Sequence, residues 1–164
     1  MKATELLKKQ HNEVKNLFSQ LERGNGNAKT LLNELANNLA AHMVIEQEIF
    51  YPAVLEADKD LVLESYEEHA VARFALKRLM RAQKNDDTFK AKLITLKEII
   101  EHHVEEEEEE LFPKAEKALK ERSTELGVEM KSLFDETKRL GYERVVGKGG
   151  VAVTSGHAPA SARA

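Results

Sequence analysis

A repeated segment is the feature of this chain that most limits its fold. Residues 42–52 read HMVIEQEIFYP, and residues 103–113 read HVEEEEEELFP. In both copies a histidine is followed four residues later by a glutamate, and a proline closes the segment after two apolar residues. The copies are offset by 61 residues (103 − 42). Because residues at i and i+4 project from the same side of a helix, the repeat predicts two equivalent helices, each presenting an imidazole and a carboxylate.

A second pair of histidines precedes these segments, His11 in HNEVKNLF and His69 in HAVARFAL, with an offset of 58 residues (69 − 11). Four helices that face one another would bring four imidazoles and two carboxylates to one place. The chain has no cysteine, so any metal must be held by nitrogen and oxygen atoms. The pattern therefore predicts a metal site formed by His11, His42, Glu46, His69, His103 and Glu107.

The helical pattern covers about the first 138 residues, and breakers divide it. The expected helices cover about 3–22, 28–57, 59–84 and 87–120, with a short fifth helix from 123 to about 138. Short connections favour antiparallel neighbours, so the fold class is all-α, an up-down-up-down four-helix bundle of two αα-hairpins. We expect the bundle at 1–122, the added helix at 123–140 and a flexible tail at 141–164.

Several local signals refine these bounds. Asn85-Asp86-Asp87 and Ser123-Thr124 are expected to cap the helices that follow them. Pro52 and Pro113 lie at equivalent places inside long helical patterns, where each is expected to kink or briefly break the helix. In the tail, a short extended segment is expected at 151–154.

The histidines and glutamates fall on the apolar stripes that would face the centre of the bundle. The expected stripes are Leu7, His11, Val14, Phe18 and Leu21; Leu32, Leu35, Leu39, His42, Glu46, Ile49 and Ala53; Val62, Tyr66, His69, Arg73 or Ala72, Leu76 and Met80; and Leu93, Leu96, Ile100, His103, Glu107 and Leu111. Burying two unpaired carboxylates costs several kcal/mol each, and a dinuclear metal centre would compensate that cost. A buried network of His–Glu hydrogen bonds without metal is the alternative.

Three neighbouring residues leave alternatives open. His102 and Glu106 form a second His-x3-Glu frame, but the alignment through Pro113 favours His103 and Glu107. Tyr66 precedes His69 by three residues, so its phenol is either a metal ligand or a buried group hydrogen-bonded to a glutamate. Arg73, one turn after His69, is expected to extend outwards or to pair with an acidic neighbour.

Composition excludes several functional classes. The net charge of −4 does not favour nucleic acid or an anionic membrane as a partner. No secretory signal and no apolar run long enough to span a membrane is evident, so a cytoplasmic location is expected. No Ser-His-Asp triad or phosphate-binding loop is present.

The ordered spacing of His11, His42/Glu46, His69 and His103/Glu107 resembles that of the hemerythrin-like (HHE) cation-binding family over about residues 5–115. The resemblance implies a non-haem di-iron centre, with two iron ions bridged by the two glutamates and ligated by the four histidines. Oxygen-carrying hemerythrins have a fifth histidine where this chain has Arg73. The resemblance therefore implies an open coordination position, or one filled by Tyr66, rather than reversible oxygen carriage.

The leading hypothesis is a di-iron protein that binds O2 or reacts with hydrogen peroxide or nitric oxide, with catalase-like turnover as one form of that activity. A non-enzymatic iron or oxygen sensor or store is the second hypothesis. A structural zinc site is the third, although such sites are normally closed, four-coordinate and often rich in thiolates.

Overall fold

The computed structural model describes residues 1–82 and 87–147, and the described part is helical with no strand. The predicted all-α class is confirmed. The α-helices are α1 (Ala3–Arg23), α2 (Ala28–Ile45), α3 (Tyr51–Val54), α4 (Lys59–Arg81), α5 (Phe89–Glu106), α6 (Phe112–Leu119) and α7 (Arg122–Leu140). Three π-helical turns interrupt or follow them, η1 (Glu46–Phe50), η2 (Glu107–Leu111) and η3 (Glu143–Gly147).

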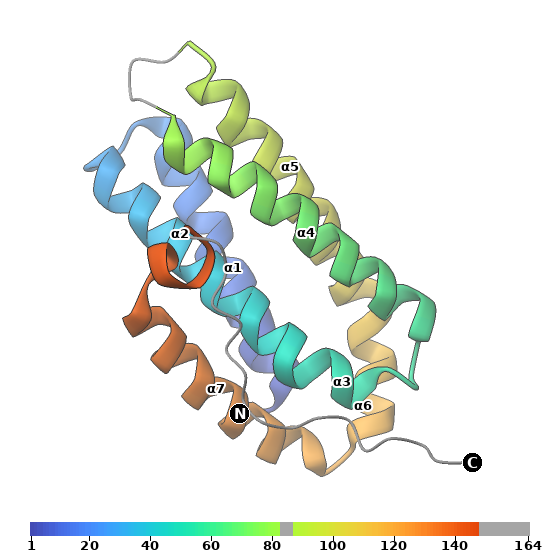
Figure 1. Cartoon of the computed structure of the whole chain (residues 1–164). Helices are drawn as coiled ribbons and strands as arrows, with labels where there is room; N and C mark the ends of the chain where they lie inside the picture. The colour runs from blue at the N-terminus through green and yellow to red at the C-terminus, as the bar shows by residue number, and fades with distance from the viewer. Residues whose placement is uncertain (83–86, 148–164) are drawn as a thin grey trace.

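The helices form the predicted up-down-up-down bundle (Figure 1). One hairpin pairs α1 with α2, and the other pairs α4 with α5. The hairpins meet where α1 packs on α5 and α2 packs on α4. Within the described residues, no helix is long and apolar enough to cross a membrane.

The first helix ends at a glycine, as the sequence predicts. Gly24 follows Arg23 with a φ of 68°, and its backbone N–H donates to the carbonyls of Gln20 and Leu21. A residue with a Cβ adopts this left-handed conformation only at a cost. Gly24 therefore stops α1 and starts the turn into α2.

At Pro52 and Pro113, where a kink or a brief break is predicted, the helix continues, and a π-helical turn, one of the usual causes of a kink, precedes each proline. The N–H of Tyr51 donates to the carbonyl of Glu46, and the N–H of Phe112 donates to that of Glu107, five residues back in both cases. Proline lacks an N–H and its ring displaces the carbonyl four residues earlier, so the hydrogen-bond ladder shifts by one residue and the helix continues.

The extra residue in each π turn changes which side chains face inwards. After Glu46 the buried side chains are Phe50, Tyr51 and Val54, whereas Ile49 and Ala53 are only partly buried. The predicted stripe of Ile49 and Ala53 is therefore wrong, because it continues the α-helical period through a turn that does not keep it. On α4 the buried residue is Ala72 rather than Arg73, which is one of the two predicted alternatives, whereas Leu79 is buried in place of the predicted Met80.

The fifth helix covers almost the predicted range, but its start is not capped as predicted. It begins at Arg122, and neither Ser123 nor Thr124 caps it. Ser123 is instead buried, and its Oγ accepts a hydrogen bond of 3.3 Å from the backbone N–H of Ala3. One turn later, a Cβ on Gly127 would lie 3.0 Å from the same Ala3 nitrogen. These small residues allow α7 to lie along α1 and α2, as Figure 1 shows.

The predicted flexible tail at 141–164 is wrong for residues 141–147. The turn η3 follows α7, with Tyr142 and Val146 buried against the bundle. The N–H of Tyr142 donates to Asn37 Oδ1 at 2.7 Å. The remaining residues, with the extended segment expected at 151–154, lie outside the described part of the chain.

The other predicted bounds shift by a few residues. Helix α4 ends at Arg81, short of residue 84, and the N-cap of α5 is Thr88. Of the predicted cap at 85–87, only Asp87 is described, and it precedes the observed cap.

Two apolar clusters fill the bundle, one towards each end. One contains Phe18, Leu35, Leu76 and Leu96, and the other contains Leu7, Ile45, Phe50, Val62 and Phe112. On each of the four main helices, the buried histidines and glutamates come where the chain passes from one cluster to the other. On α1, for example, His11 lies between Leu7 of one cluster and Val14 of the other. The polar layer is thus enclosed by hydrocarbon along the bundle axis.

Candidate metal centre

The six residues of the predicted site come together in the structure. Each is at most 5% exposed: His11, His42, Glu46, His69, His103 and Glu107. They form two groups in which one ligand atom of every member lies within 4.8 Å of the others. The first group is His11, His42, Glu46 and Glu107, and the second is Glu46, His69 and His103.

Glu46 belongs to both groups because its two oxygens face different helices. Oε1 lies 3.2 Å from His42 Nε2, and Oε2 lies 3.2 Å from His69 Nε2. A carboxylate with one oxygen towards each group is placed to bridge two cations.

Glu107 has a similar position on the other hairpin. Its Oε2 lies 3.3 Å from His11 Nε2 and 3.6 Å from His103 Nε2. Each glutamate therefore contacts one imidazole of its own hairpin and one of the other hairpin.

The outer nitrogens of three histidines have hydrogen-bond partners that orient the rings. His11 Nδ1 lies 2.7 Å from Glu108 Oε1, His42 Nδ1 lies 2.8 Å from Gln10 Oε1, and His103 Nδ1 lies 2.6 Å from Glu68 Oε2. An imidazole that donates its Nδ1–H to an oxygen presents the lone pair of Nε2 on its other side, the arrangement common to metal-binding histidines. His69 Nδ1 has no such partner among the described residues.

The nitrogen and oxygen atoms at the centre are arranged to bind cations rather than to form hydrogen bonds with one another. Among the buried atoms without a hydrogen-bond partner in the described part of the chain are five that face one another at the centre: His11 Nε2, His42 Nε2, Glu46 Oε1, Glu46 Oε2 and Glu107 Oε2. Their approaches of 3.2–3.3 Å do not have hydrogen-bond geometry. Leaving a buried polar atom unpaired costs about 1–3 kcal/mol, and a cation that accepts these lone pairs removes the cost.

The pKa values of the histidines at the centre depend on two opposing effects, burial and the negative charge of nearby carboxylates. Burial alone would lower the pKa of His11, but the negative charge of Glu107, 3.3 Å away, and the hydrogen bond with Glu108 raise that pKa to about 9. In His103, burial is likewise outweighed by the charge of Glu107 and by the hydrogen bond with Glu68, which raise the pKa to about 9. In His69 burial prevails and lowers the pKa. The carboxylates thus favour positive charge in this layer, which either a proton on an imidazole or a cation bound in its place can supply.

Tyr51 is a member of the centre that the sequence did not predict. Its hydroxyl donates to Glu107 Oε1 at 2.9 Å and lies 3.1 Å from His69 Nε2 and 3.4 Å from His103 Nε2. Burial, followed by the charges of Glu107 and Glu46, raises the pKa of this phenol well above its usual value. The available signal was the repeat itself, in which Tyr51 aligns with Phe112 and so only one copy carries a hydroxyl.

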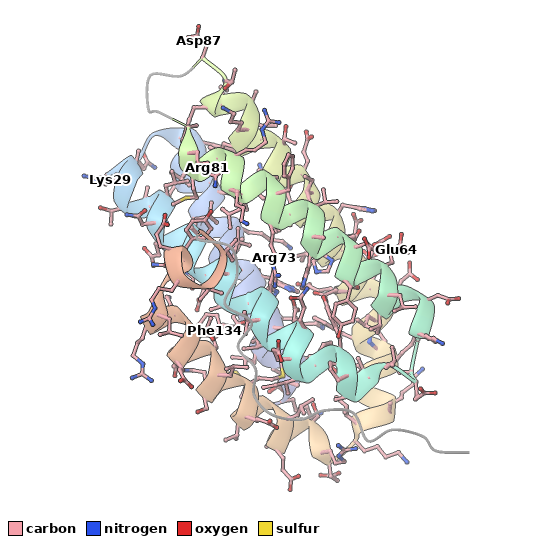
Figure 2. The ribbon with its side chains drawn as sticks, in the orientation of Figure 1. Lys29, Glu64, Arg73, Arg81, Asp87 and Phe134 are labelled. Carbon is pink, nitrogen blue, oxygen red and sulfur yellow. The ribbon has the colours of Figure 1, made fainter. Side chains whose placement is uncertain are left out.

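Tyr66 is not brought into either group. It is partly buried, and its hydroxyl donates to the backbone carbonyl of Gln47 at 3.2 Å rather than to a glutamate. Arg73 lies between α4 and the α2–η1 helix (Figure 2), where its guanidinium donates to the side-chain oxygen of Gln47. Burial lowers the pKa of Arg73. Arg73 is predicted to extend outwards or to pair with an acidic neighbour; its hydrogen-bond partner is the amide of Gln47, and the nearby Glu48 acts on it through its charge.

The two His-x3-Glu frames differ in burial. His103 and Glu107 are buried, whereas the side chain of His102 is 64% exposed. His102, Glu68 and Glu106 form a further group of possible ligands at the surface, where acidic groups commonly gather without an ion.

A small cavity adjoins the four imidazoles. Its volume is about 10 Å³, roughly that needed to hold one water molecule. Its walls are otherwise apolar, and the lining residues are His11, Val14, Leu39, His42, Met43, His69, Ile100, His103 and Val104. This space has room for about one water-sized molecule.

Comparison with known proteins gives the class to which this fold and this centre belong. The family model for the hemerythrin HHE cation binding domain matches residues 2–115. The chain is a member of this family, with buried His/Glu groups consistent with a metal site.

Individual relatives agree with this assignment. A hemerythrin HHE cation binding domain-containing protein of Mycobacterium kansasii has a crystal structure that superposes with a TM-score of 0.77 at 25% identity, over 85% of this chain and 89% of that one. An uncharacterised hemerythrin-like protein of Schizosaccharomyces pombe is 26% identical over 138 residues, 80% of this chain and 66% of that protein. A DNA nickase of Nostoc sp. (strain PCC 7120) is 28% identical over 131 residues, 76% of this chain but only 36% of the nickase.

Proposed function

We propose that this chain is a non-haem di-iron protein whose His/Glu centre binds O2 or reacts with hydrogen peroxide or nitric oxide. The observation that carries the proposal is the position of Glu46, which is shared by two groups of buried ligands. His11 and His42 would hold one ion and His69 and His103 the other, with Glu46 and Glu107 between them.

The ligand types favour iron over a structural zinc ion. Imidazole and carboxylate together suit several transition metals, whereas structural zinc sites are closed, four-coordinate and often rich in thiolates. Here one carboxylate serves two groups and no thiolate exists. Two iron ions in these positions would supply the open coordination sites and the electrons for binding or reducing a dioxygen-derived molecule.

The protein residues around the centre supply the other requirements of this chemistry. The walls contributed by Val14, Leu39 and Ile100 leave room for one small molecule and keep bulk water away. The phenol of Tyr51 holds a proton at 2.9 Å from Glu107 Oε1. It can therefore orient that carboxylate and donate a hydrogen bond within the centre.

Arg73 favours reaction over reversible oxygen carriage. It stands where oxygen-carrying hemerythrins place a fifth histidine, and its guanidinium is directed to Gln47 rather than into the ligand groups. With four histidines in the two groups, a coordination position is left for a reacting ligand. The DNA activity named for the Nostoc relative is not carried over, because this chain spans 36% of that protein.

Metal content and peroxide turnover test the proposal. Protein purified without added metal or chelator is expected to contain about two irons per chain, measured by mass spectrometry. The iron form is then expected to decompose hydrogen peroxide over many cycles. Stoichiometric oxidation without turnover would favour the sensor or store. Zinc alone, or no uptake of Fe(II) under anaerobic conditions, would overturn the di-iron centre.

A further inference from the structure

Helix α4 exposes apolar side chains along its outer face. Leu63 is 49% exposed, Val71 is 54% exposed and Phe74 is 64% exposed. Figure 1 shows α4 on the side of the bundle away from α7, and none of the described elements covers this face. Side chains of this size are usually exposed singly, whereas a row of them along one helix marks an interaction surface.

The exposed face follows a regular period. Exposed residues recur at alternating intervals of four and three along α4: Asp60, Glu64, Glu67, Val71, Phe74, Arg78 and Arg81. We call these seven residues the outer stripe. An average spacing of 3.5 residues is that of a helix that packs along a second helix.

The charges on the outer stripe divide into two halves. Its first three members are acidic and its last two are basic, and Figure 2 shows Glu64 and Arg81 towards opposite ends of α4. The helix dipole favours an acid at the N-terminal end and a base at the C-terminal end. The dipole does not explain, however, why the apolar side chains of Val71 and Phe74 are exposed between the acidic and the basic half.

We propose that the outer stripe is the dimer interface of this protein, with α4 of a second copy packed antiparallel against it. A two-fold axis at Val71 would pair that residue with its own counterpart. The same axis would place Glu67 against the partner's Phe74, Glu64 against the partner's Arg78, and Asp60 against the partner's Arg81. A parallel arrangement would instead set like charges against each other along the whole stripe, which is unfavourable.

Phe74 and Arg78 already lie together on this face. The guanidinium of Arg78 is 6.0 Å from the centroid of the Phe74 ring. In the antiparallel pair this arginine would pack on the aromatic ring and face the partner's Glu64 at the same time. The interface consists of one helix from each copy, so the dimer is weak, dependent on concentration, and weakened by salt.

Sedimentation velocity of the full chain tests this arrangement, at concentrations from about 5 to 500 µM, which bracket a weak interface. We expect a monomer–dimer equilibrium. Val71→Asp should raise the dissociation constant at least about tenfold, since it sets two carboxylates against each other at the axis. The matched control is Val128→Asp, because Val128 is 66% exposed on α7 and far from the outer stripe.

A charge exchange provides the more specific test. Glu64→Arg and Arg78→Glu each place like charges across the interface, so each should weaken the dimer. The double variant restores opposite charges and should recover most of the affinity. Circular dichroism and metal content check that every variant is folded.

The possible results either support or overturn the proposal. Loss with Val71→Asp together with rescue by the double variant supports it. A monomer at every concentration overturns it and leaves α4 to a different protein. A dimer lost with Val128→Asp but not with Val71→Asp also overturns it, because the interface would then lie on α7. The inference does not depend on the identity of the metal.

Discussion

The hydroxyl of Tyr51 lies 2.9 Å from Glu107 Oε1, although 56 residues separate the two in the chain. Tyr51 begins α3 directly after one π turn, and Glu107 opens the other π turn. The two copies of the repeat therefore meet in a contact that is not symmetric, because Phe112 stands at the position equivalent to Tyr51 and has no hydroxyl.

Tyr51→Phe tests the role of this hydroxyl. Phe112 shows that a phenyl ring suits the equivalent position, so we expect the variant to fold and to retain two metal ions per chain. Loss of a proton donor at the centre should lower the rate of peroxide decomposition by about ten- to a hundredfold. The control is Tyr66→Phe, whose hydroxyl bonds to a backbone carbonyl outside the ligand groups. A larger loss with Tyr66→Phe would contradict the assignment.

Glu46→Ala tests the shared carboxylate. Because Glu46 contributes to both groups, we expect metal content to fall from two ions per chain to one or none. Glu105→Ala is the control, since Glu105 is exposed on α5 and belongs to none of the groups of possible ligands. Mass spectrometry of the purified variants measures the effect, and two ions retained in Glu46→Ala would rule out a bridging role for this residue.

Glu68→Gln tests the orientation of His103. The variant keeps the size of the side chain but removes the negative charge that lies 2.6 Å from His103 Nδ1. Loss of an outer hydrogen-bond partner commonly costs about ten- to a hundredfold in metal affinity. Competition with a chromophoric chelator measures the affinity. Glu67→Gln, an exposed neighbour on α4, should leave it unchanged; an equal loss in both variants would point to net charge instead.

Gly127→Ala tests the close packing of α7 on the start of α1. A methyl group there would overlap the Met1 carbonyl oxygen and lie 3.0 Å from the Ala3 nitrogen, closer than ordinary van der Waals contact. Alanine favours a helix by about 1 kcal/mol over glycine, but crowding a packed site costs about 1–3 kcal/mol. Because the contacts are backbone atoms that cannot turn away, we expect a net loss of stability and a lower Tm. Glu129→Ala, exposed on the same helix, is the control; a Tm raised by Gly127→Ala would show that α7 can shift.

The bundle, and the convergence of the six buried histidines and glutamates, could be predicted from the sequence because both depend on the helical period. A histidine and a glutamate four residues apart on an apolar stripe must face inwards together, as His42 and Glu46 do. The prediction fails where the period changes. The π turns after Glu46 and Glu107 add a residue to the helical path, so Ile49 was placed in the core and Tyr51 was missed.

Other differences arise from contacts between distant parts of the chain. Ser123 has the character of a helix cap, yet its hydroxyl accepts from Ala3 of α1. Tyr142 and Val146 follow a glycine in a segment that resembles a tail, but they pack into the apolar cluster around Phe18. The local sequence around a residue does not show whether a distant part of the chain will bury it.

The enclosed layer of histidines and glutamates also sets the axial alignment of the bundle. Apolar side chains on either side of it are largely interchangeable, so hydrocarbon alone would tolerate a helix displaced by one turn, about 5.4 Å along its axis. Such a displacement would carry His69 or His103 into an apolar cluster and leave Glu46 or Glu107 without its imidazole partners. The polar layer thus penalises every sliding of one hairpin past the other, and the residues that form the centre also select a single register for the fold.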